Sequence, residues 1–185
     1  MPTFQKAPLE ILEMASDLLQ LYESHAPLLE HKVRIDFLLA FCDRDDDNNP
    51  MNDALSLHGQ KALGIARKIP LKDRVMGRGD AEICLDGDWW HESASEEQQR
   101  ALLDHELHHL ALKIVKKQVA YDDIGRPQIR LRKHDVQFGW FAVIADRHGN
   151  ASQEQIQART ILDAFGQYFF PQLMTAVPSK ALKNA

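Results

Sequence analysis

Residues 101–113 read ALLDHELHHLALK and place three histidines and two acidic residues within six consecutive positions of a leucine-rich segment. Leucine and alanine favour a helix here, and Ser95 followed by Gln98 is typical of a capping box at its start. The sequence therefore predicts a helix over about residues 95–115. Four residues roughly opposite His105 would form an apolar band that packs into the core: Leu103, Leu107, Leu110 and Ile114.

His105 and His109 are four residues apart, so on a helix both imidazoles point in the same direction. They can share one metal ion, and Glu106 projects beside them, close enough to reach a water bound to that metal. This H-E-x-x-H pattern is typical of zinc metallopeptidases, in which zinc acidifies the water and the glutamate accepts its proton as the water attacks a carbonyl. Because both histidines must be neutral to bind, we expect metal affinity to fall in acid.

A catalytic zinc site needs a third protein ligand, and the downstream sequence offers several candidates. The extended metzincin pattern is absent, because Leu112 and Val115 stand where its glycine and third histidine would be. We expect His134 to be the third ligand, since it lies where a strand meets a helix and can be aimed at a fixed point. The other candidates are His148, Asp122, Asp123 and Asp135.

Several residues near the predicted metal site have alternative roles. Asp104 would either accept a hydrogen bond from a ligand histidine or be a solvated carboxylate. Tyr121 would stabilise an oxyanion or be an ordinary strand tyrosine. Trp89 would line a substrate cleft, or pack with Trp90 in the core or at the start of the helix. His108 falls off the metal-binding side of the helix and is not expected to be a ligand.

The remaining sequence predicts an α+β fold, with helices packed on a short mixed sheet. Residues 8–30 repeat apolar residues at helical spacing and predict an N-terminal helix that Pro27 ends or interrupts. Three strands are expected before the metal-site helix, and a hairpin and two helices after it. The expected strands are 33–45, 61–71 and 81–87; the hairpin is 116–134; and the helices are 136–147, capped by Asp135, and 152–174.

Other segments are expected to lack regular structure. Residues 43–53 are rich in Asp and Asn and predict an exposed loop. The segments 72–80 and 86–95 are expected to be turns, and 175–185 a frayed tail.

Composition limits the class of protein. The chain has 185 residues, of which 44% are apolar and 26% charged, with a formal net charge of −5. This balance predicts a single domain over residues 1–185 without strong nucleic-acid binding, although the basic segment 126–134 could contact DNA or an acidic protein locally. Cys42 and Cys84 are expected to be free thiols. Without a signal peptide or a long apolar stretch, the sequence predicts a cytoplasmic protein with no membrane partner.

Two blocks of the sequence resemble a family of phage metallopeptidases. Residues 61–110 contain a glycine-bearing strand, a DR turn, an I-x-x-D strand and the HELxH helix, and residues 133–149 contain an HD segment followed by aromatic residues. The resemblance covers about residues 33–149. One departure concerns the aromatic position, because Phe138 precedes the expected place and Trp140 follows it.

This resemblance implies a small zincin-like domain, similar in outline to the SprT-like proteases. Residues 33–149 would be its metallopeptidase-like core. His105, His109 and His134 would bind Zn²⁺, and Glu106 would be the acid–base residue, in the cytoplasm of the host if the protein is phage-encoded.

Three hypotheses about function follow. The first is a zinc-dependent peptidase acting on a protein or peptide substrate. The alternative is a non-catalytic, metal-stabilised binding or regulatory protein that acts on a host or phage protein partner. A third is a phage factor that acts on a DNA-bound host protein, against which the acidic net charge argues. The patterns predict no oligomeric state.

Overall fold

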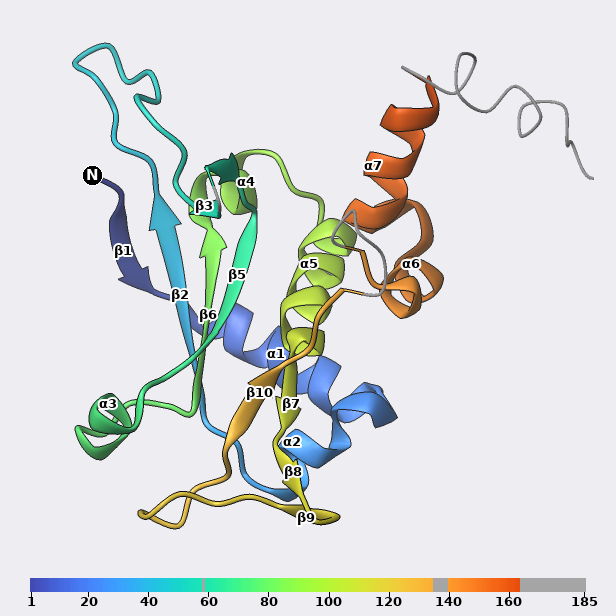
Figure 1. The fold of residues 1–185 in the computed structure, drawn as a ribbon. Coiled ribbons are helices and arrows are strands. Elements are labelled where there is room, and N and C mark those ends of the chain that lie inside the picture. The colour runs from blue at the N-terminus through green and yellow to red at the C-terminus, as the bar shows by residue number, and fades with distance from the viewer. Residues whose placement is uncertain (58, 135–139, 164–185) are drawn as a thin grey trace, which may run out of the picture.

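A four-stranded mixed sheet forms the centre of the protein (Figure 1). The computed structural model describes residues 1–57, 59–134 and 140–163, and all statements about structure refer to these parts. Strands β2 and β6 are parallel, whereas β1 is antiparallel to β2 and β5 is antiparallel to β6. In spatial order the strands are β1 (Thr3–Lys6), β2 (Ile35–Phe41), β6 (Ala81–Asp86) and β5 (Gly64–Lys68).

Seven α-helices and two short 3₁₀ helices surround this sheet in the described residues. Helices α1 and α5 pack against each other, α7 lies near the upper end of α5, and α6 lies beside its middle (Figure 1). Helix α3 lies at the lower end of the sheet. The α-helices are α1 (Leu9–Leu21), α2 (Ala26–Glu30), α3 (Leu71–Val75), α4 (Gly87–Glu92), α5 (Glu96–His109), α6 (Ala142–His148) and α7 (Gln153–Ile161); the 3₁₀ helices are η1 (Glu23–His25) and η2 (Gly149–Ala151).

Three small two-stranded sheets complete the fold. The chain leaves α5 directly into β7 (Leu110–Leu112), which pairs with β10 (Ile129–Leu131). Between them, β8 (Ile114–Val115) and β9 (Gln118–Val119) form a hairpin that extends below the sheet (Figure 1). The third pair, β3 (Ser56–Leu57) and β4 (Gln60–Lys61), precedes β5.

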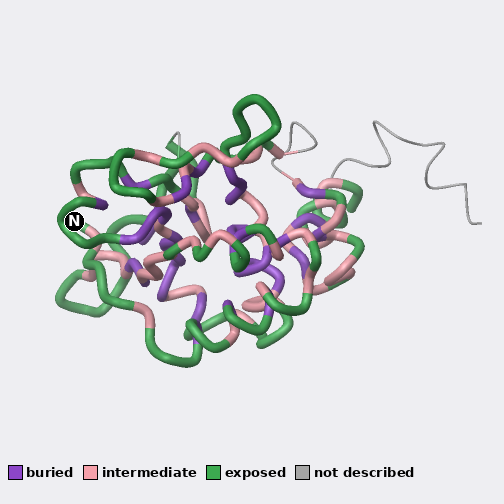
Figure 2. The backbone as a smooth tube through the Cα atoms, turned by 90° about the horizontal axis from the view of Figure 1, so that it is seen from below, coloured by how far each residue is buried: buried purple, intermediate pink, exposed green. Residues whose placement is uncertain are grey.

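The main hydrophobic core includes residues of the sheet and of helices α1 and α5. Leu18, Ile83, Leu103 and Leu107 are all fully buried in it, and each such side chain contributes about 1.5–3 kcal/mol through removal of apolar surface from water. Buried segments accordingly gather in the interior, with exposed segments around the rim (Figure 2). The core fixes α5 against the sheet, and with it the histidines that α5 carries.

The predicted α+β fold class is confirmed, and so are three strands and the exposed loop at 43–53. The strands β2, β5 and β6 lie within the predicted ranges, and both cysteines are free. The N-terminal strand β1 was not predicted. None of the described helices has the length and apolar character that a membrane crossing requires.

The predicted N-terminal helix over 8–30 is interrupted, but at Tyr22 and not at Pro27. Helix α1 ends at Leu21, because Tyr22 adopts an extended conformation, with φ −108° and ψ 120°. The chain then turns through η1, which brings His25 into the interior. Pro27 lies in the first turn of α2, where a proline needs no hydrogen-bond donor, so it begins a helix instead of ending one.

The metal-site helix is shorter than predicted. It ends at His109, and Leu110 is already extended, with φ −81° and ψ 129°, because β7 pairs with β10. The predicted apolar band is therefore only partly correct. Leu103 and Leu107 are buried on the helix and Leu110 is buried on a strand, whereas Ile114 is 56% exposed.

Two segments expected to be turns contain short helices. Residues 71–75 form α3, and residues 87–92 form α4, whose first turn is capped by Asp86 accepting from the Trp89 amide at 2.9 Å. The predicted C-terminal helix is present as α7, with Ser152 as its N-cap, and is described to Ile161. The predicted cap at Asp135, Phe138 and the continuation of the helix to 174 lie outside the described residues.

Candidate metal centre

Three imidazoles converge at the lower half of α5. His105 and His109 come from the helix and His134 from the segment after β10, and one ligand atom from each lies within 4.8 Å of the others. The Nε2 atoms of His105 and His134 are 3.3 Å apart. The structure thus brings together the three residues that the sequence suggested as ligands, in an arrangement that could hold a metal ion.

The β7–β10 pair brings His134 to this place. Leu131 of β10 lies opposite Leu110, the residue that follows His109. The Arg132 amide then donates to the His109 carbonyl at 2.7 Å, which ties the end of β10 to the end of α5. Two residues later the chain reaches His134. The β7–β10 hydrogen bonds therefore bring His134 close to His109, although the two are 25 residues apart in the sequence.

Each helical histidine has a partner on its outer ring nitrogen. His105 Nδ1 is hydrogen-bonded to Glu154 Oε1 at 2.6 Å, and His109 Nδ1 to the Arg132 carbonyl at 3.1 Å. An acceptor at Nδ1 places the ring proton there and leaves Nε2 with a lone pair directed at the cluster. Both imidazoles are therefore held in the tautomer that binds a metal through Nε2.

Glu154 is a functional residue that the sequence reasoning missed. It lies in the first turn of α7, is 3% exposed, and also accepts from the Phe141 amide at 3.4 Å. The sequence could have indicated only that some acceptor was needed, because a histidine that binds a metal through one ring nitrogen usually donates a hydrogen bond from the other. Nothing in its spacing from His105 identified it, because the two residues are 49 positions apart.

A single aromatic ring packs against the whole cluster. The Phe141 ring centroid lies 4.9 Å from those of His105 and His134 and 4.8 Å from that of His109. Phe141 is 1% exposed, so it shields one side of the imidazoles from water. Sequence reasoning considered Phe138 and Trp140, which precede it in this segment, but not Phe141.

Glu106 lies against the edge strand β5. It is 4% exposed, and a Cβ atom added at Gly64 would lie 2.6 Å from its Oε1, so a glycine is needed there. Burial raises the pKa of Glu106 to about 7, although the neighbouring His105 and the Ala66 amide favour its charged form. A carboxyl group that titrates near neutral pH is suited to accepting and returning a proton.

The electrostatics of the two helical histidines differ. Burial, together with the charges of His105, His134 and His108, lowers the pKa of His109 to about 4, so it is neutral at pH 7. Burial also opposes the charge on His105, but the hydrogen bond that His105 donates to Glu154 and the negative charge of Glu106 raise its pKa overall. A proton therefore competes with a metal mainly at His105.

A cleft of about 670 Å³ opens beside the cluster. Strand β5 and the β3–β4 segment line one side, α5 lines the base, and residues 131–134, Trp140 and α7 line the other side. His105, Glu106 and His109 all face into this cleft from α5. The arrangement combines three converging imidazoles, a carboxyl group with a raised pKa and a space for a substrate.

The family described as "Putative phage metallopeptidase" matches residues 3–165 of the chain. The chain belongs to this family. No curated protein and no solved structure matches it. Membership of the phage metallopeptidase family supports a metal-dependent peptidase in general terms, and with it a protein or peptide substrate.

Asp104 of this phage metallopeptidase family member takes neither of its expected roles. It is fully buried, and its carboxylate bonds His25 Nε2 at 2.6 Å, His148 Nε2 at 2.9 Å and Arg147 Nη1 at 3.1 Å. Its described partners therefore do not include His105 or His109, and it is not a solvated carboxylate. Glu154 occupies the position beside a ligand histidine that Asp104 was expected to fill.

Tyr121 and Trp89 are not among the described residues that line the cleft. Tyr121 is 50% exposed and its hydroxyl is bonded to His31 Nδ1 at 2.8 Å. Trp89 packs against the main hydrophobic core, in agreement with the simpler of its two interpretations.

The other candidate third ligands lie elsewhere or outside the described residues. His148 is bonded to Asp104, and Asp122 forms an ion pair with Arg74 at 2.9 Å. Asp123 is exposed and does not belong to the histidine cluster, and Asp135 is not described.

Proposed function

We propose that the protein is a zinc-dependent peptidase in which His105, His109 and His134 hold the metal and Glu106 is the acid–base residue. One observation carries the proposal: three imidazole nitrogens converge next to a buried glutamate at the side of a cleft. Family membership supports the same class of activity.

The cluster fits a zinc ion. Tetrahedral zinc with Zn–N bonds of 2.0–2.1 Å places two ligand nitrogens about 3.3 Å apart, and the Nε2 atoms of His105 and His134 are 3.3 Å apart. Three protein ligands leave one coordination position open, as in catalytic zinc sites. The acceptors at Nδ1 of His105 and His109 are the outer hydrogen bonds that zinc-binding histidines generally make.

When bound, zinc would supply a Lewis acid that polarises the scissile carbonyl and makes water more acidic. Glu106 would accept a proton from the attacking water and return it to the leaving amine. Its pKa of about 7 allows both transfers at neutral pH. Phe141 excludes bulk water from one side of the ligands, and Glu154 holds the His105 ring in place.

Strand β5 supports a peptide as substrate. It is the last strand of the sheet, with β6 on one side and no strand of the described residues hydrogen-bonded to its other side. Residues Gly64, Ile65 and Ala66 line the cleft, so an extended peptide could pair with this edge and present its carbonyl beside Glu106.

Replacement of Glu106 by Gln tests the proposal. We expect Glu106→Gln to retain zinc, because Glu106 is not a ligand, and to lower peptide hydrolysis by at least about 100-fold, because the proton acceptor is lost. Zinc content is measured on the purified protein, and cleavage on a proteome-derived peptide library by mass spectrometry. Glu96→Gln, an exposed carboxylate on the same helix, is the matched control.

Two results would contradict the mechanism in different ways. Undiminished cleavage by Glu106→Gln would remove Glu106 from the reaction. Stoichiometric zinc in the wild-type protein without any cleavage of the library would favour the alternative of a non-catalytic, metal-stabilised binding protein.

A further inference from the structure

The cleft has an unbalanced set of charges. Apart from its histidines, the charged side chains that line it in the described structure are Lys61, Arg132, Lys133, Glu106 and Glu154. Both acidic side chains already have contacts within the protein. Glu154 is bonded to His105, and Glu106 is only 4% exposed because it packs against β5. The other charged side chains of this lining, Lys61, Arg132 and Lys133, are all positive.

The three cationic residues stand on both sides of the site. Lys61 lies at the end of β4; its side chain is 55% exposed and forms an ion pair with Asp86 at 3.6 Å. Lys133 is exposed and directly precedes His134. Arg132 directly precedes Lys133, and its Nη1 contacts the His108 ring nitrogens at 3.1 Å.

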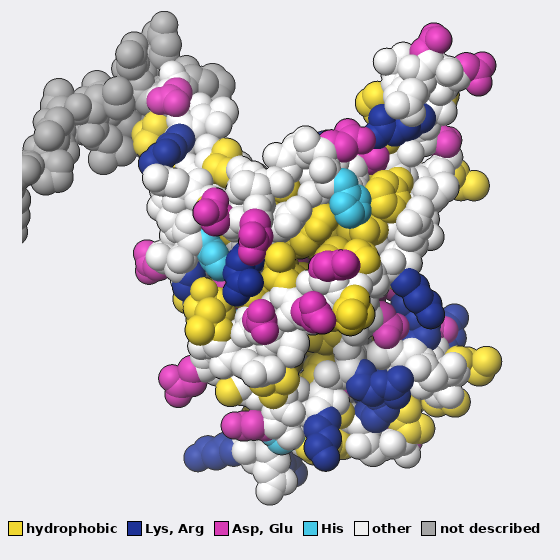
Figure 3. Space-filling model, turned by 180° about the vertical axis from the view of Figure 1, so that it is seen from behind, with side chains coloured by type: hydrophobic (Ala, Val, Ile, Leu, Met, Phe, Trp, Pro, Cys, Tyr) yellow, Lys and Arg dark blue, Asp and Glu magenta, His cyan; other side chains and the backbone are white. Residues whose placement is uncertain are grey.

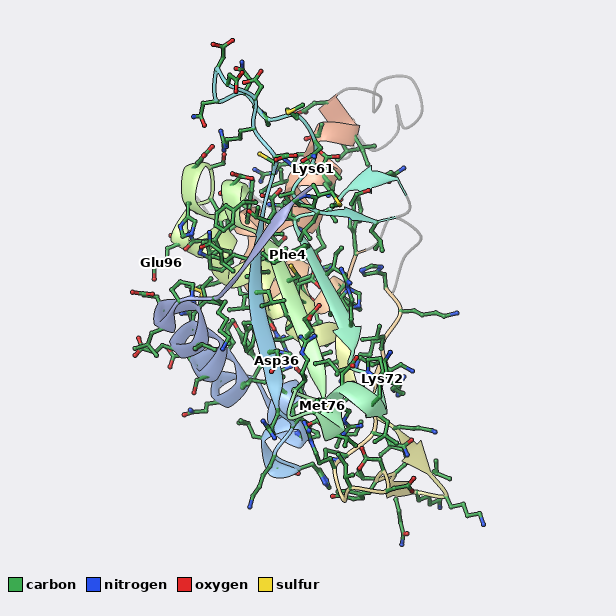
Figure 4. All side chains as sticks on the ribbon, turned by 90° about the vertical axis from the view of Figure 1, so that its left-hand side faces the viewer. Phe4, Asp36, Lys61, Lys72, Met76 and Glu96 are labelled. Atoms are coloured by element: carbon green, nitrogen blue, oxygen red, sulfur yellow. The ribbon has the colours of Figure 1, made fainter. Side chains whose placement is uncertain are left out.

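Exposed cations continue along the two strands that border the cleft. Arg67 and Lys68 end β5, and Arg130 lies on β10. Glu82 faces Arg67 across the β5–β6 pair, but Arg78 is bonded to it at 2.5 Å. Figure 4 places Lys61 near the upper end of the sheet and Lys72 near its lower end, so basic residues occur along its length.

These basic residues in and beside the cleft form a positive region, which we call the basic rim, on a protein that is acidic overall. The rim consists of Lys61, Arg67, Lys68, Arg130, Arg132 and Lys133. The whole chain has a net charge of −5, so a surface taken at random would be acidic. On the face seen from behind in Figure 3, most Asp and Glu side chains cover the middle and upper parts, and most Lys and Arg side chains cover the lower part. Charges of one sign around a cleft raise the local concentration of oppositely charged ligands.

We propose that the cleft selects peptide segments that carry Asp or Glu side chains close to the cleaved bond. This inference rests on the proposed function, because it concerns the same cleft. It adds the class of substrate that the cleft would bind. An extended peptide in the cleft would lie between Lys61 and Lys133, so carboxylates on its side chains can approach these cations. Because these cations are exposed, the selection is expected to weaken as salt increases.

Binding of defined peptides tests this inference without relying on turnover. The probes are a fluorescent decapeptide with three Glu residues, the same peptide with Gln in their place, and the same peptide with Lys. Binding is measured by fluorescence anisotropy to zinc-loaded Glu106→Gln protein at low salt. We expect the Glu peptide to bind at least about 5-fold more tightly than the Gln peptide, from several exposed charge pairs acting together.

Charge-reversal variants locate the effect. Lys133→Glu should remove most of this preference and Lys133→Arg should retain it. Lys6→Glu, on strand β1 away from the cleft residues, changes the net charge equally and should leave the preference unchanged. Equal binding of the Glu and Gln peptides would overturn the inference, and so would an equal loss in Lys133→Glu and Lys6→Glu.

The inference and the proposed function fail separately. Cleavage of library peptides by the wild-type protein without enrichment of Asp or Glu around the cleaved bonds would retain the peptidase and refute the substrate class. A preference for the Glu peptide that depends on Lys133, without cleavage of any library peptide, would refute the peptidase and retain the acidic ligand.

Discussion

At the scale of single residues, hydrogen bonds in the candidate site hold His105 and His109 each in one orientation. His105 is bonded to the carboxylate of Glu154, whereas His109 is bonded to a main-chain carbonyl. A substitution can remove the Glu154 carboxylate but not the main-chain carbonyl of Arg132. The effect of a hydrogen-bond acceptor on metal binding can therefore be measured at His105.

We expect Glu154→Ala to weaken zinc binding by about 10- to 100-fold, which is the usual effect of removing a hydrogen-bond partner of a ligand. Glu154→Gln keeps an acceptor oxygen and should lose less. Zinc affinity is measured by competition with a chromogenic chelator, with Gln155→Ala on the same helix as control. Unchanged affinity in Glu154→Ala would mean that His105 needs no acceptor to bind the metal.

The pH dependence of zinc affinity follows from the two helical histidines. A metal binds the neutral imidazole, so affinity falls as pH decreases through the pKa of each ligand. The pKa of His105 is raised above its ordinary value, whereas that of His109 is lowered to about 4. We therefore expect loss of affinity to begin above pH 6.5, through His105, and to steepen only in stronger acid.

Chelator competition between pH 4 and 8 measures this profile. Affinity that stays constant down to about pH 5 would contradict the raised pKa of His105. Glu154→Ala should shift the onset of the loss to lower pH, because the hydrogen bond that His105 donates to Glu154 is the main influence that raises this pKa.

At the scale of elements, one buried carboxylate joins three parts of the chain. Asp104 of α5 bonds His25 of η1 and both Arg147 and His148 of α6. Arg147 also donates to Ser24 Oγ at 2.8 Å. Burial opposes the charge on Asp104, but the hydrogen bonds from His148 and His25 and the charge of Arg147 hold its pKa well below its usual range.

We expect Asp104→Asn to lower the free energy of unfolding by about 3–5 kcal/mol, since it leaves a buried cation without its counter-charge. A carboxyl whose folded pKa is depressed stabilises the fold above its unfolded pKa of about 3.9 and loses this contribution as pH falls further. The difference from wild type should therefore be full at pH 7 and shrink in strong acid.

Urea denaturation at several pH values measures this difference. Asp17→Asn, on the exposed face of α1, is the control and should have little effect. A loss that persists undiminished at pH 2 would show that the contribution of Asp104 is not that of its charge.

At the scale of the whole molecule, the proposed metal joins α5 to the segment that follows β10. Removing it should therefore lower the stability of the fold and not only the activity. At a free zinc concentration 100 times its Kd, binding stabilises the folded state by about 2.7 kcal/mol.

We expect a chelator to lower the Tm of the wild-type protein and to have little effect on His134→Ala, which lacks one ligand. Differential scanning fluorimetry measures both. If residues 1–185 form a single domain, as the sequence predicts, zinc-loaded protein should unfold in one transition. Tight zinc retained by His134→Ala would refute the proposed third ligand.

The sequence alone determined the features that depend on neighbours within one turn or one strand. The capping box at Ser95 and Gln98 located the start of α5, and the spacing of His105 and His109 placed both imidazoles on one side of it. Short apolar segments of strand length located β2, β5 and β6. These signals are local, because helix and strand geometry fixes the relative directions of nearby side chains.

Only the tertiary structure decided the features that depend on distant partners. Leucine-rich residues 110–112 suit a helix, yet they form a strand because β10 supplies hydrogen bonds. Glu154, rather than Asp104, reaches His105, since α7 folds over α5 and Asp104 turns toward η1 and α6. A carboxylate can satisfy any nearby histidine, so its partner is set by the packing of helices far apart in the chain and not by its position in the sequence.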